Sequence, residues 1–102
     1  MRPDKLDDST IDAWLAKHSE WKRSSPAGAP DRGAIVREFA FKDFVTALGF
    51  VVRVGCIAER RDHHPDVELG WGRARILWST HDAKGITRLD LELAESTDGL
   101  LP

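Results

Sequence analysis

Three of the four histidines in this 102-residue chain, His63, His64 and His81, stand where an acid–base site could form. Imidazole is the side chain that titrates nearest neutral pH, so a group of histidines can both donate and accept protons. Asp62 adjoins His63 and Glu59 lies one helical turn before it, so carboxylates are available to orient the rings. No activated nucleophile is evident. The pattern therefore predicts proton transfer rather than covalent catalysis.

A hairpin predicted around Gly72 would bring these histidines together. Residues 67–71 and 74–80 have the composition and alternation of strands, and Gly72 is typical of a tight turn between them. A turn centred there would place His64 opposite His81. Directly opposed residues of an antiparallel pair have Cα atoms about 4.5–5.5 Å apart, so both side chains could reach one small ligand.

Zinc binding is the alternative use of such a cluster. Three histidines and an acid could hold the ion and leave one position open for water. Adjacent histidines such as His63 and His64 rarely reach one metal together, and no His-x-x-x-His pair lies on a predicted helix. We therefore expect neither a metal nor another cofactor at this site.

The elements that must position the histidines follow the order α-β-β-α-β-β-α, which predicts an α+β fold. Capping-box patterns open a first helix near Ser9 and a last helix near Thr87. Two strands, around Trp21 and over residues 34–40, are separated by a loop rich in turn-forming residues. The longest helix is predicted over residues 42–61, and Pro65 requires it to have ended before His64.

This long helix is expected to form the spine of the core. Its apolar residues recur with the helical period, at Phe44, Val45, Leu48, Val51, Val52, Gly55 and Cys56. Cys56 is accordingly expected to be buried as a small apolar side chain.

Composition narrows the class of protein. With 15 Lys and Arg against 17 Asp and Glu the formal charge is −2, which disfavours electrostatic binding of nucleic acid. No apolar stretch approaches the ~20 residues that span a bilayer, so no membrane partner is expected. A single cysteine agrees with a reducing compartment. We expect one domain over residues 1–102, located in the cytoplasm.

From residue 34 to residue 94 the chain resembles the pterin-4a-carbinolamine dehydratase family almost without gaps. Four stretches carry the resemblance: Phe-Ala-Phe-Lys-Asp-Phe at 39–44, Ala-Glu-Arg-Arg-Asp-His-His-Pro at 58–65, Ser-Thr-His-Asp-Ala-Lys-Gly-Ile-Thr at 79–87 and Asp-Leu-Glu-Leu-Ala at 90–94. The resemblance implies a four-stranded antiparallel sheet with three helices on one face. It also implies assembly into homodimers or homotetramers.

The implied reaction is dehydration of a 4a-hydroxytetrahydropterin to the quinonoid dihydropterin, without a cofactor, in tetrahydropterin recycling. This implies a functional link to an aromatic amino acid hydroxylase. His63, His64 and His81 match the family's active-site histidines, and Asp90 matches the acid that supports the last of them. The residues that the resemblance assigns to substrate binding are Glu59, Asp62, Trp21, Ser79 and Thr80.

A non-catalytic interaction module is the alternative that the same resemblance leaves open. The family scaffold also serves as a partner that stabilises dimers of a transcription factor, and related members assist enzyme assembly. The presence of all three histidines beside matching acids favours catalysis. We expect His63 and His81 to transfer protons and His64 mainly to bind the pterin.

Overall fold

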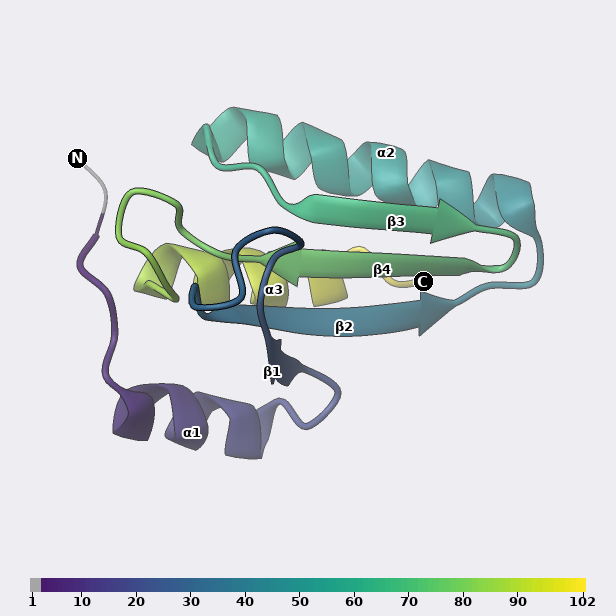
Figure 1. The fold of residues 1–102 in the computed structure, drawn as a ribbon. Coiled ribbons are helices and arrows are strands. Elements are labelled where there is room, and N and C mark those ends of the chain that lie inside the picture. The colour runs from purple at the N-terminus through teal and green to yellow at the C-terminus, as the bar shows by residue number, and fades with distance from the viewer. Residues whose placement is uncertain (1–2) are drawn as a thin grey trace.

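The computed structural model describes residues 3–102, with the elements α1 (Asp8–Lys17), β1 (Lys22–Ser24), β2 (Ala34–Ala40), α2 (Phe44–Arg61), β3 (Asp66–Gly70), β4 (Arg73–Trp78) and α3 (Arg88–Asp98). The strands form one antiparallel sheet in the order β1-β2-β4-β3 (Figure 1). Side chains from all three helices join a single core against this sheet. This confirms the expected fold class and element order. None of the helices in the described part of the chain combines the length and the apolar character that spanning a bilayer requires.

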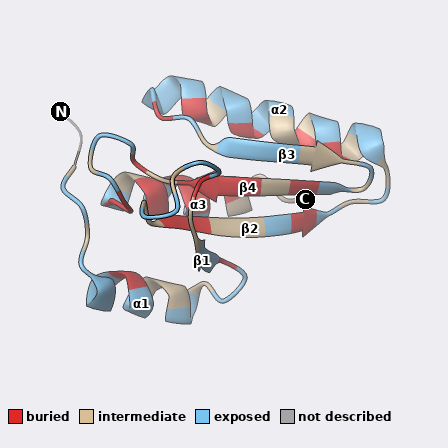
Figure 2. Ribbon diagram, viewed as in Figure 1, coloured by how far each residue is buried: buried red, intermediate tan, exposed pale blue. Residues whose placement is uncertain are grey.

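The two central strands supply the floor of the core. Ile35 of β2 pairs with Trp78 of β4, Phe39 pairs with Ala74, and all four side chains are buried. Paired residues project from the same face of a sheet, so this face meets the helices. Figure 2 shows the burial concentrated on β2 and β4, whereas most of β3 is exposed. The sheet therefore contributes to the core mainly through its two central strands, and β3 is an edge strand.

Helix α2 packs on the sheet with a different face from the one we expected, although Val51 of the expected set does pack against the core. Its buried stripe consists of Ala47, Phe50, Val54 and Ala58. Val45, Leu48 and Val52 keep 69%, 39% and 56% of their surface exposed, and Cys56 is exposed as well. The prediction was wrong because α2 carries apolar residues on two faces. The helical period alone does not say which of them meets the sheet.

The first two helices each have an aspartate as the N-cap residue. Asp43 accepts a hydrogen bond from the backbone N–H of Thr46 at 2.9 Å and so caps α2. Bonds from Thr46, its hydroxyl first and its N–H second, lower the pKa of Asp43. Asp7 caps α1 in the same way, so this helix starts earlier than the predicted cap at Ser9. Both caps satisfy N–H groups that the first helical turn leaves unpaired.

Candidate active site

The β3–β4 hairpin turns slightly earlier than expected. Gly70 pairs with Arg73, so the turn consists of Trp71 and Gly72, with Gly72 at φ 70°. If this register continued past the strands, His64 would lie opposite Ser79 rather than opposite His81. The expected direct pairing of the two histidines is therefore wrong. His81 lies instead in the loop that leads from β4 to α3.

The ring of His63 is fixed by a buried carboxylate. Its Nε2 lies 2.7 Å from Oδ1 of Asp90, and the two residues are 5% and 0% exposed. A carboxylate accepts hydrogen bonds, so Nε2 is the donor to Asp90, and Nδ1 takes no part in this contact. The ring also lies nearly parallel to that of Trp78, with centroids 5.8 Å apart. Packing and hydrogen bonding together set both its orientation and its tautomer.

The second oxygen of Asp90 ties this histidine to the start of α3. Oδ2 accepts the backbone N–H of Thr87 at 2.9 Å and the hydroxyl of Thr80 at 2.7 Å. The predicted capping box at Thr87 is thereby confirmed. Its acid, however, supports His63 and not His81 as the family resemblance suggested. Both oxygens of Asp90 are engaged without His81, because Oδ1 contacts His63 and Oδ2 accepts from Thr80 and Thr87 at the two ends of the loop between β4 and α3.

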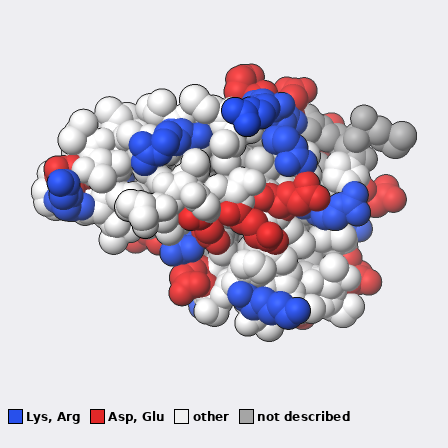
Figure 3. Space-filling model, turned by 180° about the vertical axis from the view of Figure 1, so that it is seen from behind, with Lys and Arg blue, Asp and Glu red and all other residues white. Residues whose placement is uncertain are grey.

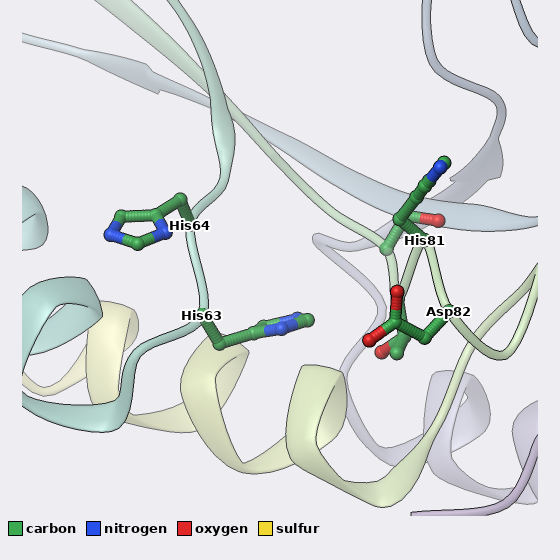
Figure 4. A pocket seen from close by; sticks show the side chains of 6 residues that line it. His63, His64, His81 and Asp82 are labelled. Carbon is green, nitrogen blue, oxygen red and sulfur yellow. The ribbon is translucent and has the colours of Figure 1, made fainter. Parts of the chain in front are cut away.

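A pocket of about 210 Å³ opens above this pair. It is lined by His63, His64, Ser79, Thr80, His81 and Asp82. Figure 4 shows the rings of His64 and His81 directed away from each other, with the ring of His63 between them in this view. The chain thus brings the three histidines to one pocket, but only His63 is locked in place. The other two imidazoles are on the rim.

The two acids predicted beside the histidines occupy different positions. Glu59, in the last turn of α2, lies 3.4 Å from Nε2 of His64, and these side chains are 76% and 57% exposed. Asp62 ends α2 in the left-handed conformation, at φ 50°, and this lets the chain turn towards His63. Asp62 does not line the pocket. Glu59 can therefore hold His64 loosely, whereas the backbone of Asp62 positions the neighbouring histidine.

The two predicted hydroxyl residues line the pocket, but their hydroxyls are engaged within the protein. Ser79 donates to the carbonyl of Gly33 at 2.7 Å, which fastens β4 to the loop before β2. Thr80 is 1% exposed and donates to Asp90. Both residues therefore form part of the pocket wall, and their hydroxyls bind other parts of the protein.

Trp21 lies in the core and not in the wall of this pocket. It is 2% exposed, packs edge-on against Phe39, and donates through Nε1 to Asp98 at 3.0 Å. The resemblance placed it at the pocket wall, but Asp98 at the end of α3 anchors it away from the lining residues. Its aromatic ring is therefore part of the hydrophobic core.

Sequence reasoning missed Asp82 in the lining and Trp78 beneath His63. Asp82 stands next to His81 in the sequence, and that adjacency was the one available signal. The strand alternation predicted that Trp78 faces inward but could not identify the ring against which it packs. Among residues 3–102, no group of three His, Cys, Asp or Glu side chains is arranged to hold a metal ion.

A family model and the similar proteins of known sequence agree on one family. A family model described as pterin 4 alpha carbinolamine dehydratase matches residues 4–100. A protein of Rhodospirillum rubrum, provisionally named pterin-4-alpha-carbinolamine dehydratase, is 41% identical over 98 residues, which cover 96% of this chain and 97% of the relative. A Bradyrhizobium protein with the same provisional name is 49% identical over 69 residues, covering 68% of this chain and 70% of its own.

Two solved structures share the fold. A crystal structure of a transcriptional coactivator/pterin dehydratase from Brucella melitensis superposes with a TM-score of 0.85 at 31% identity, covering 97% of this chain and all of that one. A pterin dehydratase-like protein, identified as a RuBisCO assembly factor in the alpha-carboxysome, superposes with a TM-score of 0.64 at 17% identity. The match covers 81% of this chain and 90% of that one. At that identity the second likeness extends to the fold alone.

Proposed function

Because this chain belongs to the pterin 4 alpha carbinolamine dehydratase family, we propose that it eliminates water from a 4a-hydroxytetrahydropterin and releases the quinonoid dihydropterin. The observation that carries the proposal is the buried pair of His63 and Asp90, which opens on a pocket bordered by two further histidines. Such a pair supplies an oriented imidazole at the wall of a cleft, which is what proton transfer to a bound substrate needs.

The reaction requires two proton transfers and no change of oxidation state overall. The C4a–O bond breaks as its oxygen takes up a proton and leaves as water. The N5–H bond gives its proton to a base, and the N5 electron pair forms the new C4a=N5 double bond. General acid and base groups on the protein are sufficient for these steps, so the proposed mechanism uses no metal or organic cofactor.

We assign the two proton transfers to His63 and His81, and pterin binding mainly to His64. His63 enters the reaction in one tautomer, since Asp90 holds its Nε2–H. His81 and His64 are exposed, so their rings can turn towards a substrate in the pocket. Glu59, beside the His64 ring, can limit that motion.

Stopped-flow dehydration of a synthetic 4a-hydroxytetrahydropterin tests this function directly. The wild-type protein should accelerate loss of the substrate well above the protein-free rate, and a His63→Ala/His81→Ala double variant should lose most of that acceleration. His18→Ala is the matched control, because His18 stacks on Trp14 of α1 and is absent from the pocket lining. If the wild-type protein leaves the protein-free rate unchanged, the dehydratase assignment is wrong.

The proposed reaction would place the protein in tetrahydropterin recycling, in the cytoplasm, alongside an aromatic amino acid hydroxylase. An oxygenated pterin must be dehydrated before it can be reduced again, so an enzyme that consumes tetrahydropterin would supply the substrate. A reductase acting on the quinonoid dihydropterin would then consume the product.

We also propose that the chain forms homodimers or homotetramers through α2. The face of α2 that we expected in the core is left uncovered, with Val45, Leu48 and Val52 exposed along it. In Figure 3 the surface at the upper left, over this helix, is mainly uncharged. A second copy that presents the same face would bury these side chains in a closed, two-fold arrangement.

A further inference from the structure

The turn that carries His81 is fixed at its base and exposed at its tip. Thr80 and Gly85 exchange two backbone hydrogen bonds, of 2.9 and 3.2 Å, which close the turn. Residues 85–87 are buried, whereas His81 and Asp82 are exposed. The position of the His81 ring therefore depends on how firmly the base of the turn is held.

The backbone of this turn is strained. Lys84 lies at φ 58°, in the left-handed region that residues other than glycine rarely adopt. Its N–H donates to the carbonyl of His81 at 3.1 Å, so the strained residue and the histidine belong to one turn. Strain of this kind persists where the surrounding structure enforces it. Contacts from outside the turn must therefore supply part of its order.

Such contacts come from residues 3–6, the segment before α1, which we call the N-terminal strap. The N–H of Leu6 donates to the carbonyl of Ile86 at 2.8 Å, and Lys5 forms an antiparallel bridge with Thr87. In Figure 1 this segment passes beside the loop between β4 and α3. The side chain of Leu6 packs against the hydrophobic core and anchors the strap. The strap thus pairs with the residues that directly follow the turn.

Gly85 lets the strap lie close against the turn. A Cβ atom at this position would stand 3.1 Å from Cε and 3.2 Å from Cδ of Lys5, closer than side chains normally pack. The absence of a side chain on Gly85 therefore leaves room for the stem of Lys5 to cross the base of the turn.

The base of the turn is also connected to the buried pair of His63 and Asp90. The hydroxyls of Thr80 and Thr87 lie 2.8 Å apart, and Thr80 donates to Asp90 at 2.7 Å. Because the strap pairs with Thr87, continuous contacts run from the strap to the carboxylate that orients His63. A displaced strap would therefore change how His81 is placed relative to His63.

We propose that the N-terminal strap positions His81 for proton transfer and acts through the hydrogen bond from Leu6 to Ile86. This inference rests on the proposed function, in which His81 transfers a proton. None of residues 3–6 lines the histidine pocket, so the strap acts through the turn and not on the substrate. A catalytic group that is misplaced by about 1 Å can cost about 10²-fold in rate, so a loosened turn should lower kcat.

The test compares Leu6→Pro with Leu6→Ala. Both variants lose the leucine side chain, but only proline lacks the N–H that binds Ile86. The kcat for dehydration of a 4a-hydroxytetrahydropterin should be roughly tenfold lower in Leu6→Pro than in Leu6→Ala. In a His81→Ala background the two kcat values should be equal, because no ring remains to be positioned. The same kcat ratio in both backgrounds would overturn the proposal, since a general loss of stability acts with or without His81.

Gly85→Ala disturbs the same contact from the side of the turn. Its methyl group meets the stem of Lys5 and should lower kcat, and Lys5→Ala in the same chain should restore kcat by removing the atoms that the methyl group meets. This pair of variants decides the matter if Leu6→Pro fails to fold by circular dichroism. An unchanged kcat in Gly85→Ala, or a loss that Lys5→Ala does not restore, would overturn the proposal.

Hydrogen exchange separates this inference from the proposed function, because it needs no substrate. The amide of Gly85, which donates to Thr80, should exchange roughly tenfold faster in Leu6→Pro than in Leu6→Ala. The amide of Ile76 in β4 is the control and should exchange at the same rate in both. Equal exchange at Gly85 would overturn the proposal whether or not the protein dehydrates pterins. Faster exchange at Gly85 but not at Ile76 would support the strap even if the wild-type protein shows no dehydration.

Discussion

Nε2 of His63 lies 2.7 Å from Oδ1 of Asp90, although 27 residues separate them along the chain. The contact joins the second residue after α2 to the first turn of α3. Because Oδ2 of the same carboxylate closes the N-terminal cap of α3, a single side chain both starts the helix and orients the ring. The stability of α3 and the tautomer of His63 therefore depend on one group.

Asp90→Asn should lower the dehydration rate by about 10²–10⁴-fold while the protein stays folded. The asparagine oxygen must face the donors of Thr80 and Thr87, so its NH₂ group faces Nε2 of His63 and favours the wrong tautomer. Stopped-flow rates measure the loss. Asp98→Asn, on the same helix but bonded to Arg37 and Trp21, is the control and should keep the wild-type rate. Equal rates in Asp90→Asn and wild type would contradict the assignment.

His81→Ala should reduce dehydration on the order of 10²–10⁴-fold with little effect on stability, because the side chain is exposed and is assigned one of the two proton transfers. Thermal unfolding should match that of the wild type. The comparison variant is His18→Ala, which removes an imidazole outside the pocket lining. Unchanged turnover in His81→Ala would exclude His81 from the proton transfers.

Prolonged dialysis against a chelator should leave the dehydration rate unchanged, since the proposed mechanism moves protons between histidines and the pterin without a metal. The measurement is the rate before and after dialysis, with the metal content determined in parallel. A rate that falls in proportion to the metal removed and returns with zinc would favour the alternative of a histidine-bound zinc ion.

Stability at acid pH should depend on Asp43, whose pKa in the folded state is lowered by its hydrogen bonds from Thr46. A carboxyl group whose pKa is lower in the folded than in the unfolded state stabilises the protein. Its contribution is complete at pH values above the pKa of the unfolded state, about 3.9, and is lost as the pH falls through the pKa of the folded state. Asp43→Asn retains a good cap but does not titrate. In urea unfolding at several pH values, its stability should vary less than that of the wild type between pH 5 and the acid limit. Parallel pH profiles would contradict this account.

Val52→Glu should convert the assembled protein into monomers, because it places a charge on the exposed apolar face of α2, where Val52 is 56% exposed. Light scattering after gel filtration should give a multiple of 11.4 kDa for the wild type and 11.4 kDa for the variant. Arg60→Glu, an exposed substitution nearer the end of α2, is the control for added negative charge. A wild-type protein that is monomeric at all concentrations would remove the basis of this prediction.

The sequence by itself determined the order of elements, the family, and five of the six residues that line the pocket, all but Asp82. Periodicity and capping patterns are local, so the helix opened by Thr87 was predictable from neighbouring residues, and so was a strand over residues 74–80, which the structure forms over Arg73–Trp78. The histidine motifs were specific because several stretches agreed with one family. No contact between distant segments was needed for any of these conclusions.

Only the tertiary structure decided which groups contact each other. The pairing of Asp90 with His63 and not with His81, the core position of Trp21, and the exposed face of α2 all depend on how helices pack on the sheet. Packing selects among faces and partners of similar polarity, and local sequence patterns do not distinguish them.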